Sequence, residues 1–160
     1  MAQGLDLTQL DTWIRPHVPA FEGPLQAEKF AGGQSNPTFK LTAGENQYVL
    51  RRKPQGTLLA SAHAVDREFK VLAALAPTNV PVPIPVALCE DETVIGSMFY
   101  IMEYLEGRIF WDPALPEVSD EDRAQIYDQM NRVMADMHSV DINEVGLSDY
   151  GKPGNYFERQ

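Results

Sequence analysis

The sequence has little of what disulfide-held and zinc-held folds are built from. Cys89 is the single cysteine, so no internal disulfide and no cysteine metal cluster can form. The three histidines, His17, His63 and His138, are scattered along the chain, which argues against a zinc site. A lone cysteine is typical of a reducing compartment, and we expect a cytoplasmic protein.

Positive charge and long apolar runs are also scarce. The chain has 13 lysines and arginines against 23 aspartates and glutamates, a net charge of −10. Such a chain is not expected to bind nucleic acid or an anionic membrane through its overall field. No run approaches the length of a membrane span, and the start of the chain lacks the basic and apolar regions of a signal peptide. An anionic ligand would have to be met by local cations and backbone amides.

The apolar pattern predicts an ordered series of helices and strands. Helices are expected over residues 6–16, where Asp6 can cap the start, over 61–76, and from about Ser119 onward. Five strands are expected, at residues 25–33, 37–43, 47–52, 86–90 and 97–104. The short connections between the first three strands make them antiparallel. Three strands, a helix and two further strands are the layout of a protein-kinase small lobe, so the predicted class is α+β.

A polar, glycine-containing stretch, FAGGQSNPTFKL, occupies residues 30–41. It can be an ordinary β-turn, because glycine and asparagine are common turn formers. It can also be a phosphate loop, in which backbone amides cradle the anion and Ser35 adds a hydroxyl donor. A strand follows the glycines, whereas the dinucleotide fingerprint and the P-loop both need a helix there. The stretch alone does not separate the two readings.

The third expected strand ends in a cluster of three cations, Arg51, Arg52 and Lys53. On a strand, Arg51 and Lys53 point to one face and Arg52 to the other. A cation that faces the loop from this strand could reach the α- and β-phosphates of a nucleotide. The alternative is a solvated edge, the usual place for a charge run.

Glu68 lies on the apolar stripe of the second helix, three residues after Val65 and four before Leu72. An ionised carboxylate there needs a partner, because burying it unpaired is costly. A cation from the third strand is the natural partner, and the alternative is a carboxylate at the margin of the stripe that reaches water. The last strand ends at Glu103, where it can either present backbone groups to an adenine edge or simply stop.

These parts, in this order, resemble the aminoglycoside/choline-kinase-like phosphotransferase family, and most of all its members associated with acyl-CoA dehydrogenases. The resemblance is carried by GGQSNPTFKL, YVLRRKPQG, SAHAVDREFKVLAAL, VPVPIPVALCED, GSMFYIMEYLEGRIFWDPALP and LSDYGKPGNYFERQ, and it covers residues 25–160. It implies a protein-kinase-like fold that binds ATP with Mg²⁺ and phosphorylates a small molecule. The residues it implies for nucleotide binding are Gly32, Gly33, Gln34, Ser35, Asn36, Arg51, Lys53, Glu68, Met102, Glu103 and Leu105.

The sequence departs from that family where the chemistry should be. The family's catalytic loop has an H-G-D-x-x-x-x-N type motif and a second aspartate for Mg²⁺, and we find neither here. In HSVDIN, Asn143 follows Asp141 too closely, and DYG at 149–151 stands in a Pro/Gly-rich loop. We therefore predict no catalytic and no metal-ligating residue in this chain, and Mg²⁺ ligands in a part of the large lobe beyond it.

The expected organisation is a nucleotide-binding small lobe with its N-terminal helix over residues 1–105, then a linker and the start of an incomplete helical large lobe over 106–160. On this reading the chain is inactive alone; the alternative is a non-catalytic nucleotide-binding or interaction module. The helix at 119–138 carries an apolar stripe that large-lobe helices would cover. Because exposed apolar stripes promote association, we expect homo-oligomers through this helix or burial of its stripe by a partner. The stripe comprises Ile126, Met130, Val133 and Met137.

Overall fold

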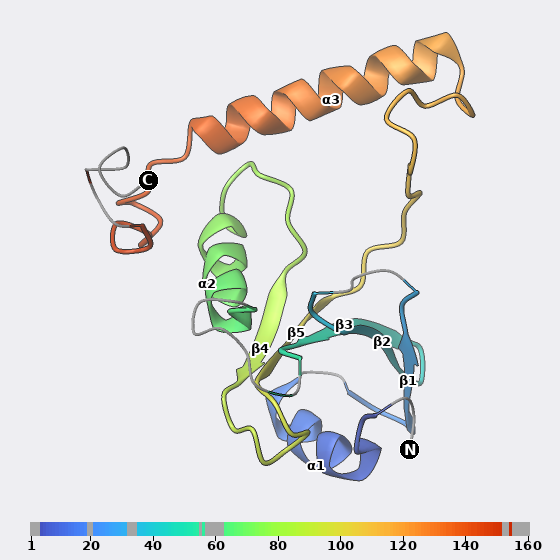
Figure 1. Ribbon diagram of the computed structural model, residues 1–160, viewed down its shortest axis with the longest axis vertical. Coiled ribbons are helices and arrows are strands. Elements are labelled where there is room, and N and C mark those ends of the chain that lie inside the picture. The colour runs from blue at the N-terminus through green and yellow to red at the C-terminus, as the bar shows by residue number, and fades with distance from the viewer. Residues whose placement is uncertain are drawn as a thin grey trace. The chain divides into compact units, whose positions relative to one another are not determined.

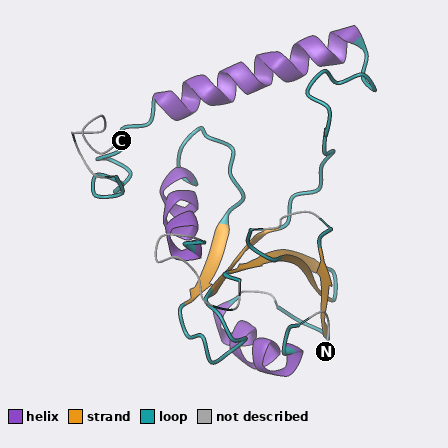
Figure 2. Ribbon diagram, viewed as in Figure 1, coloured by secondary structure: helices purple, strands orange, loops and turns teal. Residues whose placement is uncertain are grey.

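The computed structural model describes residues 4–18, 21–31, 35–54, 56, 63–151 and 154. Figures 1 and 2 show the helices and strands of the chain. In chain order they are α1 (Leu7–His17), β1 (Leu25–Lys29), β2 (Thr38–Ala43), β3 (Asn46–Arg52), α2 (Val65–Leu75), β4 (Pro85–Cys89), β5 (Phe99–Glu103) and α3 (Asp120–His138). The chain divides into two compact units, one of residues 1–73 and 83–107 and one of residues 74–82 and 108–160.

The first unit is built on a five-stranded sheet in the order β1-β2-β3-β5-β4, with every neighbouring pair antiparallel. The last strand in the sequence therefore lies inside the sheet, between β3 and β4. Residues 99–101 of β5 are buried, as its unbroken apolar run predicts. The expected class, an antiparallel five-stranded sheet with one inserted helix, is confirmed.

One face of the sheet packs against α1 and forms the core. Asp6 caps this helix, because its Oδ1 accepts the backbone N–H groups of Thr8 at 3.0 Å and Gln9 at 3.1 Å. The ring of Trp13 meets that of Phe99 edge-on, with centroids 4.9 Å apart. The core joins the apolar side of α1 to alternate residues of the strands and to four residues of the connecting segments: Leu5, Leu10, Ile14, Val18, Phe21, Phe39, Leu41, Ala43, Leu50, Cys89, Ile95, Phe99 and Ile101.

Two predicted boundaries were wrong, namely the end of the first strand and the start of the second helix. β1 ends at Lys29, so Phe30 and Ala31 belong to the loop and not to the strand. The second helix, expected from residue 61, begins at Val65. The backbone of His63 has φ 62°, a left-handed conformation that no α-helix contains, so His63 is not part of the helix; residues 61 and 62 lie outside the described residues.

The second unit contains α3, which is capped as expected. The Ser119 side chain accepts the backbone N–H of Asp122 at 3.1 Å. No residue of this helix is buried, and Met130 and Met134 are each about half exposed. Along one side of the helix runs a groove of ≈ 610 Å³, lined by Arg108, Asp122, Gln125, Ile126, Gln129, Met130, Val133, Met134 and Met137. Among the described residues, no helix is long and apolar enough to cross a membrane.

Candidate functional site

An ion pair between Arg51 and Glu68 links β3 to α2 across the sheet face that α1 does not cover. Arg51 Nε donates to Glu68 Oε2 at 2.6 Å, and Arg51 Nη2 donates to Oε1 at 3.4 Å. The two side chains are 29% and 34% exposed, so water partly screens their attraction. The predicted contact between a third-strand cation and Glu68 is therefore present. Its role in nucleotide binding stays a prediction.

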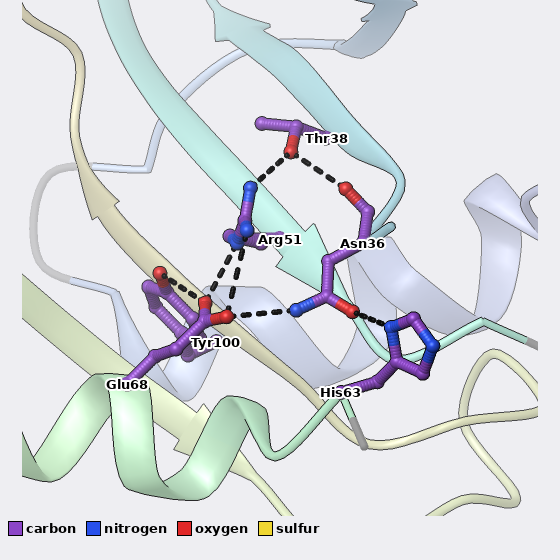
Figure 3. A network of polar contacts seen from close by, with 6 residues as sticks. All are labelled: Asn36, Thr38, Arg51, His63, Glu68 and Tyr100. Atoms are coloured by element: carbon purple, nitrogen blue, oxygen red, sulfur yellow. Dashed lines mark hydrogen bonds and ion pairs between the residues drawn. The ribbon is translucent and has the colours of Figure 1, made fainter. Parts of the chain in front are cut away.

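The strand register brings two further side chains to this pair (Figure 3). Thr38 on β2 and Tyr100 on β5 are the register partners of Arg51 on either side. Thr38 Oγ1 accepts from Arg51 Nη1 at 3.2 Å, and the Tyr100 hydroxyl donates to Glu68 Oε2 at 3.2 Å. Burial, and then the negative charge of Glu68, raise the pKa of the Tyr100 phenol. Tyr100 is thus held as a neutral donor to the carboxylate.

Asn36, within the glycine-containing stretch and just before β2, points its side chain into the same cluster (Figure 3). The residue is only 3% exposed. Its Nδ2 donates to Glu68 Oε1 at 2.8 Å, and its Oδ1 lies 2.9 Å from His63 Nδ1. Its backbone carbonyl accepts from the Thr38 hydroxyl at 3.0 Å. The site therefore ties the end of the loop, three strands and the start of α2 together.

Sequence reasoning missed three members of this cluster, namely Thr38, His63 and Tyr100. Thr38 could have been predicted to lie on the face of Arg51. A tight turn joins the two strands and sets their register, and strand alternation then determines which residues share a face. The position of Tyr100 opposite Arg51 depends on the insertion of β5 beside β3, which no local pattern specifies. His63 was considered only as a zinc ligand, and its contact with Asn36 crosses a long sequence separation.

Of the other loop residues predicted to contact the nucleotide, Gly32, Gly33 and Gln34 lie outside the described residues. Ser35 is described and exposed. Lys53 follows the last residue of β3 and is half-buried, with its backbone N–H bonded to the Met98 carbonyl at 2.9 Å. The nucleotide contacts predicted for all five residues stay predictions.

The residues predicted to meet adenine lie at and beyond the end of β5. Met102 and Glu103 are half-buried there, and the backbone N–H of Glu103 donates to the Ile84 carbonyl at 2.9 Å. An adenine contact from Glu103 would therefore have to use its carbonyl group. Leu105 has a side chain that is 57% exposed, beyond the strand. The predicted adenine contacts are not tested by these observations.

In the part of the chain that the structure describes, no group of three or more histidines, cysteines and acids is placed to hold a metal ion. Asp141, in the segment that superficially resembles a catalytic loop, makes a local turn. Its Oδ1 accepts the backbone N–H groups of Asn143 at 2.8 Å and Glu144 at 3.4 Å. These bonds hold the pKa of the Asp141 carboxyl below its ordinary value.

Comparisons with known proteins agree with this architecture. Residues 26–160 match the model of the phosphotransferase enzyme family. The chain is 49% identical over 138 residues to acyl-CoA dehydrogenase family member 10 of Mus musculus, using 86% of this chain. It is 43% identical over 159 residues to acyl-CoA dehydrogenase family member 11 of Rattus norvegicus, using 97% of this chain. It spans only 13% and 20% of the lengths of those two proteins.

A solved structure shows the same fold. A protein of Ralstonia eutropha, provisionally described as an aminoglycoside phosphotransferase, superimposes with a TM-score of 0.83 at 54% sequence identity. The match covers 97% of this chain and 44% of the solved one. The predicted resemblance, including its acyl-CoA-dehydrogenase-associated members, is confirmed. The chain belongs to the phosphotransferase enzyme family and has the kinase-like fold of an aminoglycoside phosphotransferase.

Proposed function

We propose that this chain is the ATP-binding portion of an ATP-dependent small-molecule phosphotransferase. Its first unit would be the nucleotide-binding small lobe. The observation that carries the proposal is the Arg51–Glu68 ion pair, which holds a strand cation in place beside the glycine-containing stretch. In kinases a strand cation paired with a helix glutamate contacts the nucleotide phosphates.

The hydrogen bonds of Arg51 support this role. A guanidinium has five N–H donors. Arg51 uses three of them, one each through Nε and Nη2 to Glu68 and one through Nη1 to Thr38. Two N–H groups are left outside these bonds, and a guanidinium held in a fixed orientation is well suited to phosphate oxygens. The nearby Ser35 is exposed and could add its hydroxyl.

The proposal is tested by titrating the chain with MgATP in a calorimeter, with Arg51→Met as the test variant. We expect saturable binding by the wild type and a loss of about tenfold or more in Arg51→Met, the order expected for a charge-assisted phosphate contact. Arg132→Met is the matched control, because Arg132 is 74% exposed on α3 and outside the cluster. Absent binding, or equal affinities in wild type and Arg51→Met, would contradict the proposal.

The same proposal holds that this chain does not transfer phosphate by itself. Its sequence has no H-G-D-x-x-x-x-N type motif, which in this fold supplies the catalytic aspartate. The Mg²⁺ ligands and the acceptor site would belong to a longer protein. Phosphorylation of any acceptor by the isolated chain, measured as ADP release above that seen without acceptor, would contradict this. The cytoplasmic location expected from the single cysteine stays a prediction.

The exposed apolar side of α3 favours a second candidate role, association with another copy of the chain. Met130, Met134 and Met137 are each about half exposed and line the groove together. Exposed apolar surface of this kind promotes association. The test is the molar mass in solution by light scattering, for the wild type, Met130→Glu and the control Asn131→Glu, whose site is exposed but outside the groove. A wild-type monomer, or a dimer that survives Met130→Glu, would overturn this role.

A further inference from the structure

Asn36, Thr38, Arg51 and Glu68 form a closed ring of hydrogen bonds, and His63 is bonded to it from outside (Figure 3). From this ring we propose that Asn36 and His63 are positioning residues, and that Asn36 fastens the chain just after the glycines of the stretch at residues 30–41 to the Arg51–Glu68 pair. The proposal deepens the ATP-binding function proposed above and rests on it. It moves Asn36 from the expected role of a phosphate contact to that of a support for Arg51.

The ring can be followed bond by bond. Asn36 Nδ2 donates to Glu68 Oε1 at 2.8 Å, and Glu68 Oε2 accepts from Arg51 Nε at 2.6 Å. Arg51 Nη1 then donates to Thr38 Oγ1 at 3.2 Å, and that hydroxyl donates to the Asn36 carbonyl at 3.0 Å. Asn36 is therefore held through both its side chain and its backbone. A loop that moved away would break two of the bonds that orient Arg51 and Glu68.

The chemistry of the ring is specific to an amide at position 36. Glu68 as a carboxylate only accepts, so the Asn36 group that faces it must be the NH₂. The amide oxygen then faces His63, and Nδ1 of that imidazole must carry a proton to donate to it. An aspartate would keep the acceptor for His63 but would place a second carboxylate beside Glu68. At 3% exposure, Asn36 could not replace these bonds with water.

His63 is held in a backbone conformation that few side chains adopt. Its φ of 62° lies in the left-handed region, and its carbonyl accepts the backbone N–H of Val65, the first residue of α2. Such a conformation persists in a non-glycine residue when its surroundings hold it there. The bond from its ring to Asn36 is one such restraint. His63 therefore connects the start of α2 to the end of the loop without needing to contact a ligand.

The ring predicts different effects on the binding of MgATP and of adenosine, which a merely structural contact would not predict. The ring touches the loop and the strand cation, the two parts proposed to meet phosphate, and none of the residues proposed to meet adenine. Loss of the Asn36 amide should weaken the binding of MgATP and leave the binding of adenosine nearly unchanged. It should also change the surroundings of the Arg51 Nε–H group with no ligand present.

The experiment measures both quantities on the full chain. The affinities for MgATP and for adenosine are determined by calorimetry, and the Arg51 Nε–H resonance is followed by ¹⁵N NMR without ligand. The variants are Asn36→Ala, Asn36→Asp and His63→Gly, the last because glycine adopts the left-handed backbone freely. Asn131→Ala, at an exposed position of α3, is the control for the substitution.

We expect Asn36→Ala and Asn36→Asp to lower the affinity for MgATP by about tenfold, and His63→Gly to lower it by about threefold, since each variant loses one or two hydrogen bonds of ordinary strength. The affinity of each variant for adenosine should stay within about twofold of the wild type. The Arg51 resonance should shift in all three variants and not in Asn131→Ala. Equal losses for both ligands, or an unmoved resonance, would overturn the proposal. If the wild type binds no MgATP, the proposed function fails, and the resonance alone decides whether Asn36 positions Arg51.

Discussion

Arg51 and Arg52 are neighbours on β3, but their side chains leave on opposite faces of the sheet and meet different surroundings. Arg51 pairs with a carboxylate, is 29% exposed and keeps two N–H groups outside its bonds to Glu68 and Thr38. Arg52 is 7% exposed, and its Nη1 donates to the carbonyls of Gly4 at 3.3 Å and Ile95 at 3.4 Å. Among the described residues no carboxylate is paired with it.

The surroundings of Arg52 are those of a structural residue. Its guanidinium lies 5.7 Å from the centre of the Phe39 ring, and its Nε has no hydrogen-bond partner in the described part of the chain. Burial lowers the pKa of the Arg52 guanidinium from its ordinary value. The difference shows that neighbouring cations on one strand can have different structural roles, because strand alternation places them on opposite faces of the sheet. Arg52 packs between the sheet and the chain before α1, and Arg51 pairs with Glu68 on the opposite face.

The largest effect is expected on the face that holds the core. Phe99 is fully buried against Trp13, so Phe99→Ala leaves a cavity and should lower the free energy of unfolding by about 3–5 kcal/mol. Urea unfolding followed by circular dichroism measures this. Phe30→Ala, at a position 37% exposed, is the matched control and should cost much less. Similar losses in the two variants would mean that this face is not the core of the unit.

The same substitution at the two arginines tests the comparison directly. Arg52→Ala removes a buried stem and the guanidinium that donates to the carbonyls of Gly4 and Ile95, so we expect a loss of about 2–3 kcal/mol in the free energy of unfolding. Arg51→Ala breaks a partly exposed ion pair and should cost about 1 kcal/mol or less. Urea unfolding gives the stabilities, and calorimetry below the unfolding transition gives the affinities for MgATP.

The affinities should follow the reverse order, with binding kept in folded Arg52→Ala and lost in Arg51→Ala. A result in which both variants bind equally well would show that the face of Arg51 is not the ligand face. A result in which Arg52→Ala is as stable as the wild type would show that its carbonyl contacts contribute nothing.

A smaller change in stability is expected at the partner of Arg51. Glu68→Gln keeps the shape of the side chain but sets an amide NH₂ against the donors of Asn36 and Arg51. We expect this substitution to lower the free energy of unfolding by about 1 kcal/mol or less and to lower the affinity for MgATP by about tenfold. Glu28→Gln, at an exposed position of β1, is the isosteric control for both measurements. Unchanged affinity in Glu68→Gln would separate the ion pair from nucleotide binding.

The smallest effect is expected at Tyr100, through its response to alkaline pH. Burial and then Glu68 raise the pKa of this phenol. The folded chain holds the phenol proton more tightly than the unfolded chain. The contribution of Tyr100 to the free energy of unfolding is therefore complete below about pH 10 and is lost as the pH rises above it. Between about pH 8 and pH 11, urea unfolding should therefore show a smaller loss of stability in Tyr100→Phe than in the wild type.

At pH 8, Tyr100→Phe should lower the free energy of unfolding by about 0.5–1 kcal/mol, the value of one ordinary hydrogen bond. Tyr127→Phe is the control, since that hydroxyl donates to the Pro113 carbonyl on a residue that is 43% exposed. Identical pH profiles for Tyr100→Phe and the wild type would show that this phenol ionises in the fold as it does in the unfolded chain.

Much of the first unit could be predicted from local pattern. The alternation of Phe39, Leu41 and Ala43 on β2 puts them on the face that packs against α1, as a period of two requires. The same period separates Arg51 from Arg52, and the helical period placed Glu68 on the side of α2 that reaches Arg51. These features depend only on chain neighbours, so the sequence carries them by itself.

What the sequence by itself determined is therefore the order of elements, the class of the sheet and the two faces of β3. The tertiary structure decided the rest. It placed β5 between β3 and β4, which brings Tyr100 opposite Arg51, and it turned the Asn36 side chain inward to Glu68 and His63. These contacts join residues 27 to 49 positions apart in the chain. Local propensity cannot specify such pairs, because they depend on strand order and register, which the packing of the whole unit selects.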